Sequence, residues 1–342
     1  MINAEAMKIM AQINKKFGDN VVVVGQSIRA DLITRITTGS TTFDYVLGGG
    51  FPSNQWNELI GEASHGKTAI ALKTIAANQA RDPEFTTVWV AAEQWVPEYA
   101  AMCGVDSARV IVIETNIMEE AYDAVLAFAE SKSVDAIVID SLPALVPGPE
   151  NEKNMDEMTV GRGALITNKF FRKAGAAMKR SLVEDERPIL GIVINQYRMK
   201  IGVMHGDPRT TPGGEGKNYA FFTRAEVRRD EWIEEGTGIK IRIIKNKTAP
   251  PQRVAYVDFY FSDTGSNFAG DFDVAREVAA MSMVKELVER KGGWIYHNER
   301  KWQGQEAFVS SLREEVDLLS ELRAKVLSTP DSFVGGQSGK DE

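Results

Sequence analysis

The sequence predicts an α/β protein with a central, mostly parallel sheet, preceded by a helix-strand arm and followed by a small α+β C-terminal domain. Short runs rich in Val and Ile alternate with helical patterns between residues 56 and 195. Such alternation is typical of βαβ units. After Arg224, the runs 239–245 and 254–261 partly alternate apolar and polar residues. This two-residue period indicates antiparallel strands at the end of the sheet.

Each element is predicted from its local pattern. Apolar residues at helical spacing predict a helix over 4–17, and residues 21–24 are expected to form a short strand. In the core we expect strands over 56–60, 86–92, 109–113, 134–140 and 188–195, and helices over 67–80, 118–131 and 162–183. A last helix is expected from 305 to about 327. These patterns divide the chain into an arm, a core, a small C-terminal domain and a flexible tail, over 1–30, 31–264, 265–327 and 328–342.

Composition excludes several classes of protein. The chain has 342 residues, of which 43% are apolar and 26% charged, as in ordinary globular proteins. Cys103 is the only cysteine, so an intrachain disulfide is excluded and a reducing compartment is expected. The three histidines lie far apart and lack the spacing of a zinc site. No apolar run approaches the roughly 20 residues that span a bilayer, so we expect a cytoplasmic protein without a membrane partner.

The charge is acidic overall but unevenly distributed. With 40 Lys and Arg against 48 Asp and Glu, the formal net charge is −8, which on average repels nucleic acid. Residues 168–183 and 239–253 nevertheless carry cations and no acid, whereas most residues that carry charge in 119–157 are acidic. A charged helix face is commonly only solvated. Confined cationic faces still allow a nucleic-acid partner and predict that its affinity depends strongly on salt.

The segment GEASHGKT at 61–68 lies between a predicted strand and a predicted helix and fits the P-loop pattern GxxxxGK[ST]. Backbone N–H groups of such a loop point at phosphates, helped by the positive end of the following helix. Lys67 would contact the β- and γ-phosphates, and Thr68 would ligate Mg²⁺. The candidate ATP-binding residues of the loop are Gly61, Glu62, Ala63, Ser64, His65, Gly66, Lys67 and Thr68. The alternative is an incidental glycine turn.

Two acids follow predicted strands, at the edge where parallel sheets bind their ligands. Asp140 ends the run VDAIVID and is the candidate second Mg²⁺ residue, although a strand-end Asp can also cap the next helix. Glu93 follows TTVWVAA and is the candidate general base for an attacking water; the alternative is a solvated loop acid. Together with the P-loop, these residues predict an ATPase.

The strand over 188–195 runs into a polar segment, 195–224, that is long for a connection. Gln196 at the strand tip is expected near the γ-phosphate, where it would report the nucleotide state to this segment. Its cations Arg198, Lys200 and Arg209 would meet a phosphate backbone. The alternative is a flexible surface loop.

Several motifs in the same order resemble the bacterial-type RecA recombinase family over roughly residues 4–327. They are TTGSTTFDYVLGGGFP (37–52), GEASHGKT, VDAIVIDSLPALVP (134–147), NQYRMKIGVM (195–204), TTPGG (210–214), KNKTAPP (245–251) and GGWIYHNERKWQGQ (292–305). The resemblance implies a RecA-like P-loop NTPase core. It also implies an ATP-dependent recombinase that forms helical filaments on single-stranded DNA and exchanges strands with homologous duplex DNA.

By this resemblance, ATP and Mg²⁺ bind between adjacent subunits, and Tyr99 stacks on the adenine. Lys245 and Lys247 would reach the ATP of the neighbouring subunit. Without the resemblance, the favoured interpretation is that they are only exposed cations at the end of a strand. The arm over 1–30 would pack on the next subunit. The sequence equally allows the arm to dock on the core of its own chain. The implied catalytic residues are Glu93, Lys67, Gln196, Lys245 and Lys247.

The resemblance also implies two DNA-binding loops, near 150–161 and 197–217. The implied DNA-binding residues are Arg172, Arg198, Met199, Lys200, Ile201, Gly213 and Gly214. Glycines would let backbone N–H groups approach phosphates, and Ile201 would wedge between stacked bases.

Two other function classes stay open. The first is a DNA motor of the helicase type, which the KNK motif and the arm disfavour. The second is a nucleotide-gated DNA-binding scaffold without strand exchange. Two departures from the family pattern favour the scaffold: the acidic segment 150–163, and Asn218 where the family usually carries a lysine. Such departures would suit a distant or phage-encoded relative.

Overall fold

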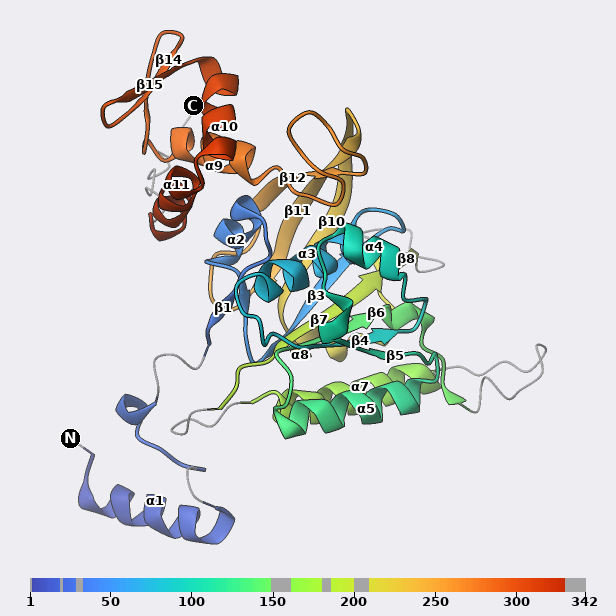
Figure 1. Ribbon diagram of the computed structural model, residues 1–342. Coiled ribbons are helices and arrows are strands. Elements are labelled where there is room, and N and C mark those ends of the chain that lie inside the picture. Colours follow the sequence, from blue (N-terminus) through green and yellow to red (C-terminus); the bar gives the residue numbers. More distant parts are fainter. Residues whose placement is uncertain are drawn as a thin grey trace, which may run out of the picture.

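The computed structural model describes residues 2–18, 21–28, 33–148, 161–179, 186–199 and 209–329. Its centre is an eight-stranded sheet with helices on both faces. Helix α1 (Ala4–Phe17) lies apart from this body, and the C-terminal elements form a separate group beyond β12 (Figure 1). Within the described ranges, no helix has both the length and the apolar character that a membrane crossing requires.

The central sheet has the strand order β12-β11-β10-β3-β7-β6-β4-β5. Its strands are β3 (Gln55–Gly61), β4 (Thr87–Ala91), β5 (Val110–Ile113), β6 (Ala136–Asp140), β7 (Leu190–Gln196), β10 (Phe221–Ile233), β11 (Gly236–Asn246) and β12 (Val254–Tyr260). The strands from β10 to β5 run parallel, and β11 and β12 extend the sheet antiparallel. The predicted mostly parallel α/β sheet is therefore confirmed.

The central strands carry apolar side chains on both faces of the sheet, so helices pack on both faces. One face carries α2 (Thr41–Leu47) and α3 (Lys67–Gln79), and the other carries α5 (Met118–Ser131) and α7 (Arg162–Ala177) (Figure 1). The short elements of the body are β1 (Arg35–Ile36), β2 (Phe51–Pro52), α4 (Pro97–Met102), β8 (Arg198–Met199), β9 (Arg209–Thr210) and α8 (Lys217–Ala220).

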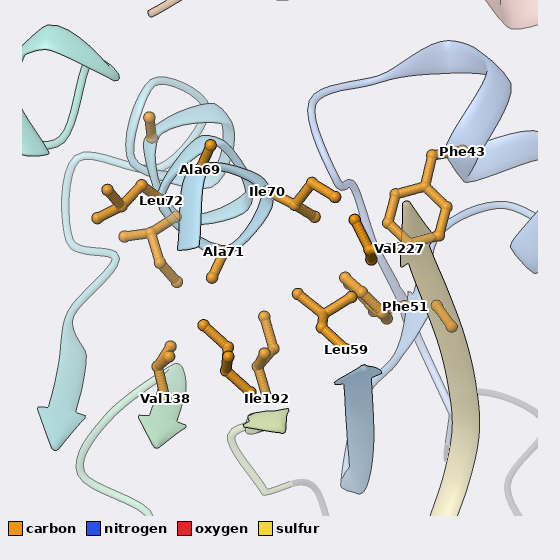
Figure 2. Close-up of a cluster of buried hydrophobic side chains, with 14 of the residues drawn as sticks. Phe43, Phe51, Leu59, Ala69, Ile70, Ala71, Leu72, Val138, Ile192 and Val227 are labelled. Atoms are coloured by element: carbon orange, nitrogen blue, oxygen red, sulfur yellow. The ribbon is translucent and has the colours of Figure 1, made fainter. Parts of the chain in front are cut away.

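Helix α3 lies over the middle of the sheet. Ile70 and Leu72 of this helix belong to one apolar cluster with Leu59, Val138 and Ile192, which come from β3, β6 and β7 (Figure 2). All five side chains are almost completely buried, and each contributes about 1.5–3 kcal/mol of hydrophobic stabilisation. This packing holds the start of α3 at the carboxyl ends of the central strands.

The C-terminal elements enclose their own apolar cluster. They are α9 (Val274–Val284), β13 (Glu289–Lys291), β14 (Trp294–His297), β15 (Arg300–Gln303), α10 (Gly304–Glu314) and α11 (Val316–Ser328). The single helix predicted from 305 to about 327 is wrong, because the chain leaves the helical conformation at Glu315 (φ −107°, ψ 86°). This break lets Phe308 of α10 and Leu322 of α11 reach the same cluster.

The N-terminal helix is confirmed, but the short strand predicted over 21–24 is wrong. A strand needs a partner for its backbone groups. Here the side chain of Asn14 takes that place at one residue. Val22 donates its N–H to Asn14 Oδ1 at 2.8 Å, and the Asn14 amide donates to the Val22 carbonyl at 2.9 Å.

Two further differences concern the core. Helix α7 ends at Ala177 rather than near 183, with Met178 as its C-cap. Strand β10, which occupies much of the segment after residue 220, was not predicted from its pattern. It carries Arg224, Glu226 and Arg228 where a simple alternation would place solvent-facing residues, but the structure buries Glu226 among arginines.

Candidate functional site

A cavity of about 410 Å³ lies at the carboxyl ends of the parallel strands. The predicted residues that line it are Ala63, Ser64, Gly66, Lys67, Thr68, Glu93, Tyr99, Asp140 and Gln196. Gly61, Glu62 and His65 complete the same loop without lining the cavity. Tertiary structure therefore brings together residues from four separate stretches of the sequence.

The loop between β3 and α3 can only be built with glycine at two of its positions. Gly66 has a φ of +88° and caps α3, and a Cβ atom there would lie 2.6 Å from Ile239 Cδ1. A Cβ atom on Gly61 would lie 2.1 Å from the Val227 carbonyl oxygen. The first turn of α3 receives no side-chain cap, so its N–H groups are available to a phosphate.

Lys67 is the cation of this cavity. Its side chain is almost buried, and its ammonium donates to the Glu62 carbonyl at 2.5 Å. Burial lowers the pKa of Lys67, while the carboxylates of Asp140, Glu93 and Glu62 oppose this shift. A phosphate would supply the negative charge that this desolvated ammonium requires.

Thr68 and Asp140 meet at the base of the cavity. The Thr68 hydroxyl donates to Asp140 Oδ2 at 3.0 Å. Burial raises the pKa of Asp140 to about 6, against the stabilising hydrogen bond from Thr68. A hydroxyl and a carboxylate are hard oxygen ligands of the kind that Mg²⁺ prefers. The residues present therefore fit a magnesium ion bound with a nucleotide.

Glu93 lines the cavity two residues beyond the end of β4. Its side chain is exposed, and Oε1 accepts a 2.6 Å hydrogen bond from the Ser141 hydroxyl. Ser141 directly follows Asp140 at the end of β6. The residue that orients the candidate base is therefore adjacent in sequence to the candidate magnesium ligand. This arrangement can orient a carboxylate toward a water molecule.

The far wall of the cavity comes from strands that the sequence did not connect with it. Arg229 of β10, Ile239 of β11 and Phe259 of β12 line it, and Arg229 donates to the Ser64 carbonyl at 2.9 Å. No local signal could have found these residues, because only the antiparallel extension of the sheet brings them to the P-loop.

Comparison with known proteins decides the family. A family model described as the RecA N-terminal domain matches residues 4–266. The chain belongs to the RecA family. It is 35% identical to Protein RecA of Thermus thermophilus over 339 residues, covering 96% of this chain and 95% of that protein.

Other relatives agree. Protein RecA of Listeria welshimeri is 34% identical, covering 93% of this chain and 89% of that protein. Protein RecA of Thermus aquaticus is 35% identical, covering 94% of this chain and 93% of that protein. Among solved structures, a crystal structure of the RadB recombinase aligns with a TM-score of only 0.49 and 17% identity over 66% of this chain and 96% of that chain, and the family assignment does not rest on it. RecA-family proteins bind ATP with Mg²⁺ and are typically DNA-dependent ATPases.

Lys245 and Lys247 of this RecA-family chain are not among the residues that line its cavity. Ile239 lines it, and Lys245 lies six residues further along β11. At about 3.3 Å per residue the separation along the strand is roughly 20 Å. Lys245 is therefore too far to reach a phosphate on the P-loop of its own chain.

Three of the described DNA-loop candidates, Arg198, Gly213 and Gly214, lie near the start of α7. Arg198 and Gly213 line one small cavity, and a Cβ atom on Gly214 would lie 3.3 Å from the Ala164 Cβ. Met199 and Arg172 are exposed, and Arg172 lies about three turns beyond the start of α7. Lys200, Ile201 and the loop near 150–160 lie outside the described residues.

Proposed function

We propose that this RecA-family chain is an ATP-dependent DNA recombinase. It forms helical filaments on single-stranded DNA and catalyses pairing and strand exchange with homologous duplex DNA. The observation that carries the proposal is the place of Gln196. Its side chain lines the nucleotide cavity, and Arg198, two residues later, pairs with Thr210 in the β8-β9 hairpin that carries the candidate DNA loop. One short stretch thus connects the nucleotide cavity with the loop that we propose to bind DNA.

In the proposed reaction, Lys67 and the N–H groups of the first turn of α3 hold the β- and γ-phosphates of ATP. Thr68 and Asp140 would hold Mg²⁺, which when bound reduces the charge repulsion at the phosphates. Glu93, oriented by Ser141, accepts a proton from the attacking water. Tyr99 stacks on the adenine, and Gln196 senses the γ-phosphate.

Self-association completes the proposed site. Because Lys245 is too far from its own P-loop, we infer that Lys245 and Lys247 stabilise the developing phosphate charge on the ATP of the adjacent protomer. Helix α1 has no buried residue and exposes Met7, Ile9 and Phe17, which supports docking on another protomer. A head-to-tail contact that does not close on itself generates a helical filament.

The test is a strand-exchange reaction with ATP, a circular single strand and a homologous linear duplex. Nicked-circle product supports the recombinase, and the same reaction with a duplex of unrelated sequence is the control. Filaments that bind DNA but form no product would instead establish the scaffold. Closed rings that unwind forked duplexes would establish the motor.

A further inference from the structure

Lys217 of α8 is a buried lysine that the proposed reaction does not use. Its side chain has no exposed surface, and its ammonium donates to Thr211 Oγ1 at 2.6 Å and to Asn218 Oδ1 at 3.0 Å. Both acceptors are neutral. Burying an ammonium without a bonded carboxylate lowers the stability of the folded protein, so packing alone does not account for a lysine at this position.

The stem of Lys217 packs directly against Gly213. A Cβ atom on Gly213 would lie 2.9 Å from Lys217 Cδ and 2.9 Å from Thr167 Cγ2, and the φ of Gly213 is +89°. The ammonium meanwhile holds Thr211. Lys217 therefore contacts both ends of the turn 211–213, which follows β9 and closes the candidate DNA loop.

The same lysine is linked to Lys245. The Lys245 ammonium donates to the backbone carbonyl of Asn218 at 2.7 Å, and the Asn218 side chain accepts from Lys217. The hydrogen bonds therefore run from Lys245 through Asn218 and Lys217 to Thr211. A phosphate of a neighbouring protomer would compete with the Asn218 carbonyl for the Lys245 ammonium.

We propose that Lys217 is a positioning residue that couples Lys245, at the neighbour's ATP, to the turn 211–213 of the DNA loop. The proposal rests on the function proposed above and adds to it a residue and a route. When Lys245 changes its partner, Asn218 shifts, and Lys217 transmits the shift to Thr211 and Gly213.

The charges around Lys217 give the coupling a pH dependence. Burial lowers the pKa of Lys217 to about 8; Arg224 on β10 lowers it further, while Glu58 on β3 and Glu215 before α8 raise it. Thr167 and Asn168 face the turn from α7 and carry no charge. The ammonium is therefore present at pH 7 and largely lost at pH 9, where its hydrogen bonds lose their charge assistance.

The experiment measures ATP hydrolysis against the concentration of a poly-dT single strand, from pH 7 to 9. For Lys217→Met, which keeps the stem and removes the donors, we expect about tenfold more DNA at half-maximal stimulation at pH 7, because hydrogen bonds from charged groups are lost. The wild type should approach the variant as the pH rises to 9. Lys132→Met is the control, because Lys132 donates to the Ala177 and Lys179 carbonyls at the carboxyl end of α7, whereas Gly214 of the loop lies against Ala164 in the first turn of that helix.

Thr211→Val removes the acceptor instead of the donor and so keeps the test informative if Lys217→Met fails to fold. The double variant should need about as much DNA for half-maximal stimulation as either single variant, because both substitutions break the same hydrogen bond between Lys217 and Thr211. Fully additive effects, or a Lys217→Met protein with the DNA dependence and pH profile of the wild type, would overturn the coupling alone. A wild type that DNA does not stimulate would overturn the proposed function, and the coupling with it.

Discussion

The hydroxyl of Thr68 donates a 3.0 Å hydrogen bond to Oδ2 of Asp140, a residue 72 positions later in the chain. Thr68 follows β3, and Asp140 ends β6, with β7 between the two strands. Parallel strands present their carboxyl ends at one edge of a sheet, so this contact follows from topology. It is the arrangement on which magnesium binding depends in the proposed function.

Asp140→Asn keeps the shape of the side chain and its bond to Thr68 but removes the charge. We expect the Mg²⁺-dependent gain in ATP affinity to fall by about 10–100-fold, because a neutral amide is a poor ligand for a hard cation. Titration of a fluorescent ATP analogue with and without excess chelator measures this gain. Asp123→Asn, on the exposed side of α5, is the control and should behave as the wild type.

Mixing two inactive variants tests the action of Lys245 on the neighbour. Lys67→Ala loses the P-loop cation, and Lys245→Ala loses the cation that we assign to the adjacent protomer. In an equal, random mixture about a quarter of the interfaces pair an intact P-loop with an intact Lys245, so roughly a quarter of the DNA-stimulated hydrolysis should return. If Lys245 serves its own P-loop, the mixture stays as inactive as its components.

Glu226 of β10 is a buried acid that several side chains share as an ion-pair or hydrogen-bond partner, among them Tyr197 and Arg209 on either side of the candidate DNA loop. Its buried carboxylate bonds Arg209, Arg228 and Arg242 at 2.7–2.8 Å and accepts from the Tyr197 hydroxyl at 3.1 Å. These arginines hold the pKa of Glu226 below its usual value despite burial.

Glu226→Gln leaves the partly exposed arginines without their shared anion. We expect the free energy of unfolding to fall by about 2 kcal/mol, less than for a fully buried pair because solvent screens the arginines. Urea unfolding followed by circular dichroism measures the loss. Glu234→Gln, on the exposed turn between β10 and β11, should change stability by less than about 0.5 kcal/mol.

Glu277 predicts how stability varies with pH. It lies buried in α9 and accepts from Ser40 Oγ and the Thr42 N–H, both at 2.9 Å. Burial raises its pKa to about 7, from 4.5. Between these values the folded protein binds a proton that the unfolded chain has lost, so the contribution of Glu277 to stability falls as the pH rises.

Glu277→Gln removes this titration. Between pH 5 and pH 8 we expect the variant to lose less unfolding free energy than the wild type does, by roughly 1–3 kcal/mol. Parallel urea unfolding at both values measures it. An unchanged difference, equal to that of the exposed control Glu299→Gln, would mean that Glu277 is ionised in the folded protein.

The amino-acid sequence by itself determined the α/β sheet, the P-loop and the pairing of Asp140 with it. These features depend on short-range patterns: glycines at two close approaches, a helix that starts at Lys67, and apolar runs that end in a polar residue. The residues predicted for the nucleotide site meet in one cavity because the order of parallel strands leaves little freedom at their carboxyl edge.

Only the tertiary structure decided the rest. The helical conformation is interrupted at Glu315, which lets α10 and α11 both pack in one apolar cluster. Glu226 of β10 is buried among arginines, of which Arg209 is distant from it in the sequence. The bonds of Lys217 to Thr211 and of Lys245 to Asn218 likewise join residues whose types alone indicate solvent-facing cations. Buried polar groups are stabilised by particular partners, and no local periodicity records which partners the fold brings to them.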